Sequence, residues 1–332
     1  MIRIALDAMG GDHAPSVVVE GAVLAAQQLG VCVVLVGPED VISSELSRFP
    51  GYPKDLISIS HAPDVVGMSE SPALSFRQKK NSSIQIGLKL VKDGHANGFV
   101  SAGNTGAVMM ASTLILGRIP GVERPAIASL IPTKAKRPVV VLDMGASVDC
   151  KPEHLAQFAT MGYYFAQSVL QKESPRVGLL SIGEEPEKGN QAVHAAFELI
   201  KALPINFVGN VEGRDILEGD VDVVVCDGFV GNVLLKFGEG ISSALFGHFK
   251  EAARSGSIRS KLGLLFLKPL LKQIYRQYDY EEYGGAPLLG VNGVSIISHG
   301  RSSAVAIKNA IRLASNDVRT NVVDKINKAI SQ

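Results

Sequence analysis

A polar loop that follows an apolar strand carries the residue types best suited to chemistry in this chain. The strand-like run at residues 221–225 leads into the loop 226–232, Cys-Asp-Gly-Phe-Val-Gly-Asn, and a helical pattern begins directly afterwards. Ligands bind at the carboxyl ends of strands in an open α/β sheet, and glycines let backbone amides approach a ligand closely. Asp227 and Asn232 add polar side chains at the same turn. We therefore expect this loop to belong to the functional site.

Other loops of similar composition follow predicted strands. They occupy residues 7–15, 101–106, 143–147, 183–190 and 298–303. In a doubly wound sheet such loops converge on one rim, and glycines ahead of helices favour phosphate, which helix N-terminal amides bind. Lys188, in a loop with three glutamates, is the cation best placed to face it. Because neither G-x-G-x-x-G nor the P-loop pattern occurs in these loops, a nucleotide is not the predicted ligand.

Several polar residues have a structural interpretation beside the functional one. His13 suits general acid or base chemistry, but a histidine after an aspartate in a turn also serves as a local hydrogen-bonding residue. Cys226 could accept an acyl group, whereas a cysteine that closes an apolar strand is usually buried. Asp143 and Asp227 both end strands, where an aspartate commonly caps the next helix; the glycines around Asp227 favour a function there. No pair of residues has the spacing of a metal site.

Length and composition predict a globular protein without a global electrostatic field. The 332 residues are 46% hydrophobic and 20% charged, and 33 basic residues against 32 acidic ones leave a net charge of +1. This balance predicts no attraction for nucleic acid. Three widely spaced cysteines indicate a reducing compartment, and Asp7 comes too early for the apolar region of a signal peptide, so we expect a cytoplasmic protein. Residues 98–117 are uncharged, but their polar loop residues favour a strand, loop and helix over a membrane span.

Short apolar runs alternate with helical patterns along the whole chain. The predicted strands are residues 2–6, 31–36, 98–101, 127–131, 139–142, 177–182, 205–208, 221–225 and 294–297. Continuous apolar strands belong to parallel sheets that are covered on both faces. A helical spacing runs from Leu155 to Val169, with Pro152 near its start. We predict a doubly wound, mostly parallel α/β fold over residues 1–332, as one elaborated domain or two closely packed lobes.

The segment 242–280 differs in composition from the rest of the chain. Its second part alternates apolar runs with basic residues and holds a single acid, Glu251. We predict a basic amphipathic helical insertion that bends at Pro269, although a helix pair packed on the core remains the alternative. A surface that meets anionic lipid or an acidic carrier protein explains both the charges and the apolar residues. The residues assigned to carrier or membrane contact are Lys250, Arg254, Lys261, Leu265, Lys268, Leu270 and Lys272.

The motifs resemble, in order, those of the acyl-acyl carrier protein:phosphate acyltransferases of bacterial phospholipid synthesis, the PlsX family. The resemblance covers essentially the whole chain and rests on the Asp-Ala-Met-Gly-Gly-Asp-His-Ala-Pro opening, the Cys-Asp-Gly-Phe-x-Gly-Asn loop, the loops above and the stretch at residues 282–290. It implies transfer of a fatty acyl group from acyl carrier protein to inorganic phosphate, which gives acyl phosphate. It also implies a fold related to phosphotransacetylases and isocitrate dehydrogenases, and a homodimer that contacts the membrane peripherally. The product is expected to be the substrate of a membrane glycerol 3-phosphate acyltransferase. The resemblance implies neither a cofactor nor a metal.

With this resemblance, the site residues acquire expected roles. Lys188 is expected to bind phosphate together with amides near residues 103–106. Asn232, or an amide of its loop, is expected to stabilise the oxyanion. Asp227 is expected to orient Lys188 or to hold a proton. The residues assigned to substrate binding are Asp12, His13, Gly103, Asn104, Thr105, Gly106, Gly183, Asn190, Gly228, Gly231 and His299. A nicotinamide-dependent dehydrogenase, a non-catalytic membrane scaffold on an enzyme fold, and a covalent route through Cys226 remain as alternatives.

Overall fold

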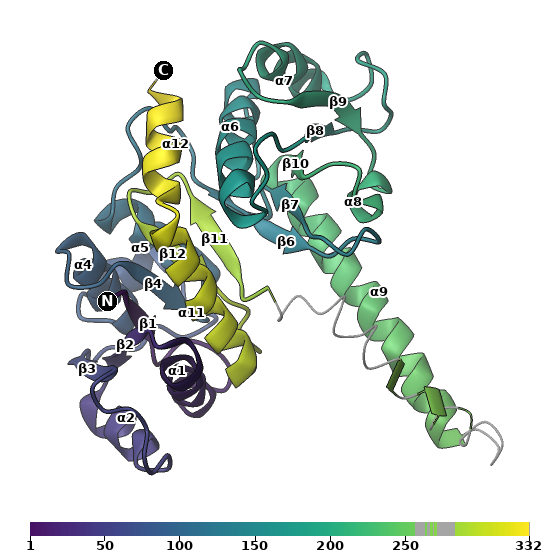
Figure 1. Cartoon of the computed structure of the whole chain (residues 1–332). Coiled ribbons are helices and arrows are strands. Elements are labelled where there is room, and N and C mark those ends of the chain that lie inside the picture. The colour runs from purple at the N-terminus through teal and green to yellow at the C-terminus, as the bar shows by residue number, and fades with distance from the viewer. Residues whose placement is uncertain (256–262, 264–265, 268, 271–282, 332) are drawn as a thin grey trace.

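The computed structural model contains two β-sheets with helices on their faces, joined side by side (Figure 1). The structure describes residues 1–255, 263, 266–267, 269–270 and 283–331. A seven-stranded sheet has the order β3-β2-β1-β4-β12-β11-β5, and a five-stranded sheet has the order β6-β7-β10-β8-β9. Most neighbouring strands are parallel, whereas β11 and β6 run antiparallel to their neighbours. The predicted α/β class with a mostly parallel sheet is confirmed.

The seven-stranded sheet is covered on both faces because its strands alternate their apolar side chains. Ile4 and Leu6 of β1 pack with the helices α1 and α11, while Ala5 faces the cluster that contains α4 and α5. The strands are β1 (Arg3–Asp7), β2 (Cys32–Gly37), β3 (Ile57–His61), β4 (Gly98–Ser101), β5 (Ala126–Ile127), β11 (Ala286–Leu289) and β12 (Val294–Ile297). The helices are α1 (Ser16–Leu29), α2 (Glu39–Leu46), α3 (Pro72–Gln78), α4 (Ser83–Lys92), α5 (Thr105–Ile115) and α11 (Ala304–Arg319). A last helix, α12 (Val322–Ile330), packs instead on the helix at residues 152–169.

The five-stranded sheet also has helices packed against it. Its strands are β6 (Ser129–Ile131), β7 (Val139–Leu142), β8 (Val177–Leu180), β9 (Phe207–Val211) and β10 (Val223–Val225). Its helices are α6 (Pro152–Val169), α7 (Gln191–Lys201), α8 (Asp215–Glu218) and α9 (Gly228–Ser255). Phe158 and Phe165 of α6 are fully buried against this sheet, which confirms the helix predicted from Pro152 to Val169.

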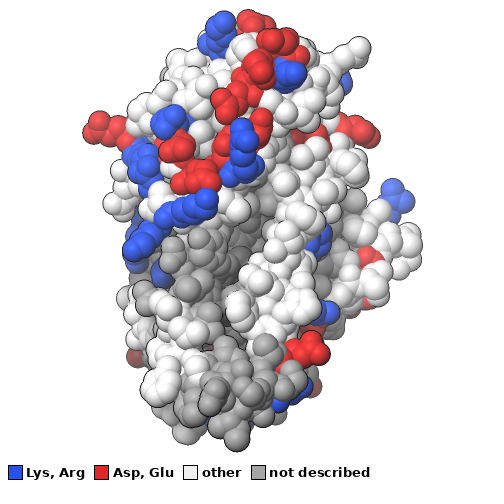
Figure 2. All heavy atoms as spheres, turned by 90° about the vertical axis from the view of Figure 1, so that its right-hand side faces the viewer, with Lys and Arg blue, Asp and Glu red and all other residues white. Residues whose placement is uncertain are grey.

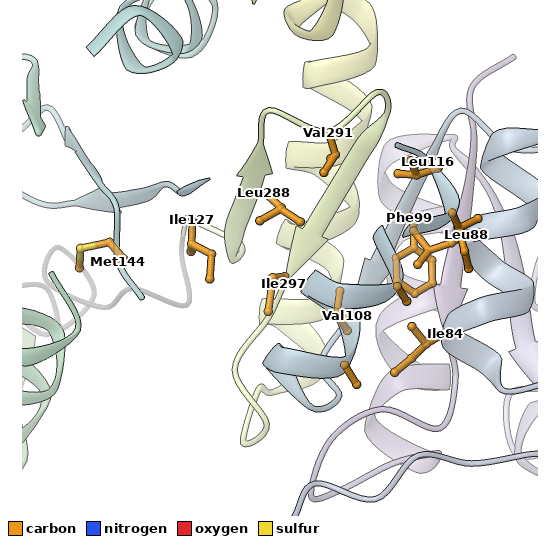
Figure 3. Packing of buried hydrophobic residues seen from close by; sticks show 14 of the residues in the cluster. Ile84, Leu88, Phe99, Val108, Leu116, Ile127, Met144, Leu288, Val291 and Ile297 are labelled. Carbon is orange, nitrogen blue, oxygen red and sulfur yellow. The ribbon is translucent and has the colours of Figure 1, made fainter. Parts of the chain in front are cut away.

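A continuous apolar core joins the two sheets. Met144, which follows β7 of the five-stranded sheet, belongs to the same buried cluster as Ile127 of β5, Leu288 of β11 and Phe99 of β4 in the seven-stranded sheet, and Figure 3 shows them in a row. The predicted single strand at residues 127–131 is in fact two strands, β5 and β6, one in each sheet. Only Ala128 separates them, so this crossing ties one sheet covalently to the other.

Helix α9 projects away from both sheets (Figure 1). It begins at Gly228 and continues past residue 242, where the predicted basic segment starts. Arg254 and Leu270 are helical and exposed, and Lys250 lies in α9. Lys261, Leu265, Lys268 and Lys272 lie outside the described residues. In the part of the chain that the structure describes, no helix has the length and apolar character needed to cross a membrane.

Candidate active site at the carboxyl edges of the two sheets

A buried carboxylate organises the edge of the five-stranded sheet. Asp143 follows β7 and is fully buried. Its oxygens accept backbone N–H groups of Ile127 at 3.0 Å, Gly145 at 3.1 Å, Ala146 at 2.9 Å and Ser147 at 2.7 Å. Burial raises the pKa of Asp143, and the four amide donors oppose that rise because they favour the ionised form. Asp143 therefore holds the loop after β7 in one shape.

The first turn of α9 packs directly on this loop. A Cβ on Gly228 would lie 2.6 Å from Asp143 Oδ2, and one on Gly231 would lie 1.9 Å from the Asp143 carbonyl oxygen. The predicted loop at residues 226–232 is thus mostly helix, because only Cys226 and Asp227 precede α9. Asp227 Oδ1 accepts the Val230 N–H at 2.9 Å, which is the capping role that was the structural alternative for this residue.

Asn232 presents an exposed amide beside the same loop. Its Cβ would be 3.5 Å from a Cβ on Gly145, so the side chain lies over the loop that Asp143 organises. No hydrogen bond of this amide occurs among the described residues. The N–H groups of Gly228, Val230 and Gly231 already donate to the carbonyl of Ser147, to Asp227 Oδ1 and to the carbonyl of Asp227. The exposed amide of Asn232 is therefore the side-chain donor here that can meet an anion or a developing oxyanion.

Lys188 lies on a separate loop at the same edge. Its carbonyl oxygen accepts Ser181 Oγ at 2.9 Å and Asn210 Nδ2 at 3.4 Å, which hold the loop after β8 in place. The side chain is exposed, and among the described residues its ammonium group forms no ion pair. Among the described residues, no ion pair joins Asp227 to Lys188, so the expected pairing is not seen. Gly183 lies against the methylenes of Lys188, and Asn190 caps α7 through the Val193 N–H at 2.9 Å.

The two nearby thiols are poor nucleophiles. Burial raises the pKa of Cys226 well above its usual range and that of Cys150 to about 11, and the carboxylates of Asp143 and Asp227 add to both shifts. Cys226 is buried and directs its sulfur at the Asp143 carbonyl. A thiol that stays protonated at neutral pH cannot readily accept an acyl group, which argues against the covalent route.

The edge of the seven-stranded sheet contains a second buried aspartate. Asp7 Oδ2 accepts Ser101 Oγ at 2.7 Å, and Ser101 Oγ in turn accepts the Gly103 N–H at 3.0 Å. Burial raises the pKa of Asp7. A Cβ on Gly10 would lie 2.6 Å from Asp7 Oδ2, so the backbone of the first loop crosses directly over the carboxylate.

Asn104 fixes the start of α5 to a neighbouring segment. Its Oδ1 accepts the Ala107 N–H at 3.0 Å, and its Nδ2 donates to the carbonyls of Met68 at 2.9 Å and Glu70 at 3.0 Å. Thr105 and Gly106 form the first turn of that helix. Asn104 is buried with all these bonds made, so it positions the helix start and its amide has no spare donor for a ligand.

The loops at residues 7–15 and 298–303 also meet at this edge. Asp12 N–H donates to the Gly300 carbonyl at 2.7 Å, and Arg301 Nε lies 3.8 Å from Asp12 Oδ2. His13 is exposed, and His299 Nδ1 accepts the Arg301 N–H at 3.2 Å. The loops at residues 7–15, 101–106 and 298–303 therefore meet at the edge of the seven-stranded sheet, whereas those at residues 143–147 and 226–232 meet at the edge of the five-stranded sheet, so the expected loops divide between two sheet edges. Among the residues that the structure describes, no hydrogen bond joins Lys188 to residues 103–106.

Sequence reasoning missed the residues that hold these loops in place. Asp7, Asp143, Ser101 and Asn210 are buried and carry the hydrogen bonds that shape the candidate site. A usable signal existed for the two aspartates, because each ends an apolar strand and is followed within three residues by a glycine. Among the described residues, no group of three or more His, Cys, Asp or Glu side chains could hold a metal ion.

Solved structures share this fold. A phosphotransacetylase from Streptococcus pyogenes superposes over 96% of this chain and 94% of its own with a TM-score of 0.63 and 17% identity. A 4-hydroxythreonine-4-phosphate dehydrogenase from Klebsiella pneumoniae gives a TM-score of 0.57 at 14% identity over 96% of this chain and 100% of its own. At such identities the likeness concerns the fold alone.

Sequence comparison decides the family. The model of the family described as fatty acid synthesis protein matches residues 2–325. The chain is 52% identical over 329 residues to a phosphate acyltransferase of Pelotomaculum thermopropionicum, which covers 99% of this chain and 95% of that protein. A phosphate acyltransferase of Desulforamulus reducens is 53% identical over 330 residues, 99% of this chain and 98% of that protein. The chain belongs to this family, which confirms the resemblance to the PlsX proteins, and it is an acyltransferase of lipid synthesis.

Proposed function

We propose that the protein transfers a fatty acyl group from the thioester of acyl carrier protein to inorganic phosphate, and that the acyl phosphate serves phospholipid synthesis. The observation that carries this proposal is the identity above 50% over almost the full chain to proteins named phosphate acyltransferase. The helix starts and glycine-rich loops at both sheet edges support it, because they offer backbone N–H groups to anions without a nucleotide fingerprint.

The proposed reaction needs two negatively charged groups to be stabilised. A phosphate oxygen attacks the thioester carbonyl carbon, a tetrahedral oxyanion forms, and the carbon–sulfur bond breaks to release the carrier thiol. Lys188 and the amides near residues 103–106 bind phosphate, while Asn232 or an N–H at the start of α9 stabilises the oxyanion. The second oxygen of Asp227 is proposed to take the proton that phosphate loses. Asp12, His13, Asn190 and His299 are proposed to contact substrate around this centre.

The direct test is an assay with purified protein, palmitoyl carrier protein and phosphate that follows acyl phosphate and free carrier thiol together. We expect both products in equal amounts and only when phosphate is present. Thiol release without phosphate would identify a thioesterase. No release would favour the non-catalytic scaffold and would contradict the proposal.

Replacing Lys188 with methionine tests the phosphate site. The substitution keeps the apolar stem and removes the ammonium group, so we expect the apparent KM for phosphate to rise about tenfold or more, with a smaller change in the KM for acyl carrier protein. Steady-state kinetics at varied phosphate measure this. Lys201→Met, at an exposed lysine in the last turn of α7, is the matched control and should leave both values unchanged. An unaltered KM for phosphate in Lys188→Met would remove Lys188 from the site.

We further propose that the protein is a cytoplasmic homodimer with peripheral membrane contact, from which a membrane glycerol 3-phosphate acyltransferase receives the product. An exposed apolar row on α9 supports self-association. It comprises residues spaced four apart, each 41 to 66% exposed: Phe229, Val233, Phe237, Ile241, Leu245 and Phe249. Figure 2 shows charged side chains crowding the upper part of the molecule, over the five-stranded sheet, and fewer of them among the described residues below it. Exposed apolar patches of this kind mark interaction surfaces.

Glutamate at Phe237 and Ile241 together is expected to convert the dimer to a monomer, because two charges would be buried without partners. Sedimentation velocity measures the change, and Leu199→Glu, at an exposed leucine of α7, is the control.

Flotation with anionic vesicles, repeated with Leu270→Glu, tests the membrane contact. A wild-type protein that sediments as a monomer, or fails to float, would contradict the corresponding part of the proposal.

A further inference from the structure

A stretch between Ser71 and Lys92 is basic and contains no acidic residue. It carries Arg77, Lys79, Lys80, Lys89 and Lys92, in a chain whose acids and bases are otherwise almost equal in number. The stretch forms α3 and α4, with a short connection between them. We call this surface the α3–α4 face.

Little of this positive charge is neutralised within the chain. Lys79 pairs with Glu70 at 2.6 Å, and this bond holds the pKa of Glu70 below its usual range. Lys89 Nζ donates instead to the Lys80 carbonyl at 3.2 Å, which brings two basic residues together. Among the described residues, Arg77, Lys80 and Lys92 form no ion pair. The α3–α4 face therefore keeps an excess of positive charge that is exposed to solvent.

The α3–α4 face adjoins the candidate active site. Pro72, the first residue of α3, lies 2.7 Å from the position that a Cβ on Gly106 would take, so α3 packs on the first turn of α5. Asn104 holds the segment before α3 through the carbonyls of Met68 and Glu70. Figure 1 shows α4 beside α5 at the outer side of the seven-stranded sheet.

Two exposed apolar side chains lie on or next to α3. Leu74 of α3 is 57% exposed and Met68 is 41% exposed. Met68 Cε lies 2.6 Å from where a Cβ on Gly300 would be, so this side chain reaches the loop after β12 at the rim. Exposed apolar side chains therefore accompany the basic residues where the α3–α4 face adjoins the start of α5.

We propose that the α3–α4 face is the docking surface for the acyl carrier protein, whose acidic surface faces Arg77, Lys80 and Lys89 while its acyl thioester passes Met68 to the start of α5. This inference rests on the proposed function and names the partner's place on the chain. Charge complementarity at the rim of an interface speeds association and orients the partner. A membrane fits this face less well, because Leu74 is the one large apolar side chain exposed on α3 or α4 and insertion needs a wider apolar surface.

Charge reversal at Arg77 and Lys80 together tests the docking surface. In Arg77→Glu/Lys80→Glu we expect the KM for acyl carrier protein to rise about tenfold or more at low salt, with less difference from wild type at high salt. The kcat at saturation and the KM for phosphate should stay within about twofold of wild type, since neither residue belongs to the proposed reaction centre. Lys54→Glu/Lys201→Glu changes the net charge equally at exposed sites elsewhere and should have no effect.

The outcomes separate this inference from the proposed function. Without wild-type turnover of acyl carrier protein and phosphate, the proposed function itself fails. An active wild type with an unchanged KM in the double variant would overturn the docking surface, as would a rise seen only in Lys250→Glu/Arg254→Glu. Loss of anionic vesicle binding with an unchanged KM would assign the face to lipid and also overturn it. If thermal unfolding shows that Arg77→Glu/Lys80→Glu does not fold, the variant Lys89→Glu/Lys92→Glu, with both changes on α4, takes its place.

Discussion

Gly231→Ala is expected to destabilise the protein by about 3 kcal/mol or more and to abolish most activity. The added methyl group would lie 1.9 Å from the Asp143 carbonyl oxygen and 3.1 Å from Met144 Cα, and both are backbone atoms. Neither can move without disturbing the loop that four N–H groups hold around the Asp143 carboxylate. The first turn of α9 must then shift, and Asn232 would shift with it. Chemical denaturation of the variant, followed by circular dichroism, measures the loss.

A second glycine of the same helix supplies the control. Gly238 has no atom within 4 Å of its would-be Cβ and is exposed. Gly238→Ala should therefore stabilise the protein by about 0.5 to 1 kcal/mol, because alanine restricts the unfolded chain more than glycine does. Equal stability of the two variants would show that α9 does not pack against the loop after β7 as described.

The second expected result is a loss of stability between pH 5 and pH 8 that depends on Asp317. This residue near the end of α11 is 3% exposed, and its Oδ1 has no hydrogen-bond partner. Burial raises its pKa to about 8. The folded state therefore retains a proton that the unfolded state has already released above about pH 4. Because the folded state binds more protons in this window, the free energy of unfolding falls as pH rises and levels off above pH 8.

Asp317→Asn removes that proton equilibrium. We expect the free energy of unfolding of wild type to fall by about 2 to 4 kcal/mol more than that of the variant between pH 5 and pH 8. The slope is the measurement, since any cost of the buried amide is the same at every pH. Asp324→Asn, at an exposed acid on α12, should keep the wild-type slope. Parallel pH profiles for wild type and Asp317→Asn would show that the carboxyl is not held protonated.

The strands that could be predicted from the chain are those buried on both faces. β4, β7 and β12 have the predicted bounds, because runs of apolar residues have few other places in a folded chain. β3 was missed because its sequence alternates polar residues with isoleucine at a sheet edge, where only one neighbour is present. β11 was missed because Pro287 and the preceding glycines suggest a turn. Its strand form depends on antiparallel pairing with β12, the next strand in the chain, and with β5, which is distant in sequence.

The candidate site, too, could be predicted from the sequence only where local residues determine the structure. A glycine-rich polar loop was predicted correctly as the place where strands end, since loop composition is local. Whether Asn104, Asn190 and Asp227 bind ligand or cap helices depends on the backbone that follows each of them. The structure places all three as caps. Asp143 could not be ranked above them, because its importance comes from N–H groups that a folded loop brings around it.

The sequence by itself determined the α/β class, the family and the set of loops in which the chemistry must lie, because apolar periodicity and short motifs depend on neighbouring residues. Only the tertiary structure decided that these loops divide between the edges of two sheets, that Lys188 and Asp227 do not pair, and that the first turn of α9 is built onto the Asp143 loop. These features depend on contacts between segments that are far apart in the chain, such as Gly231 with Asp143. Their energies come from close packing and burial, which no local pattern of residues records.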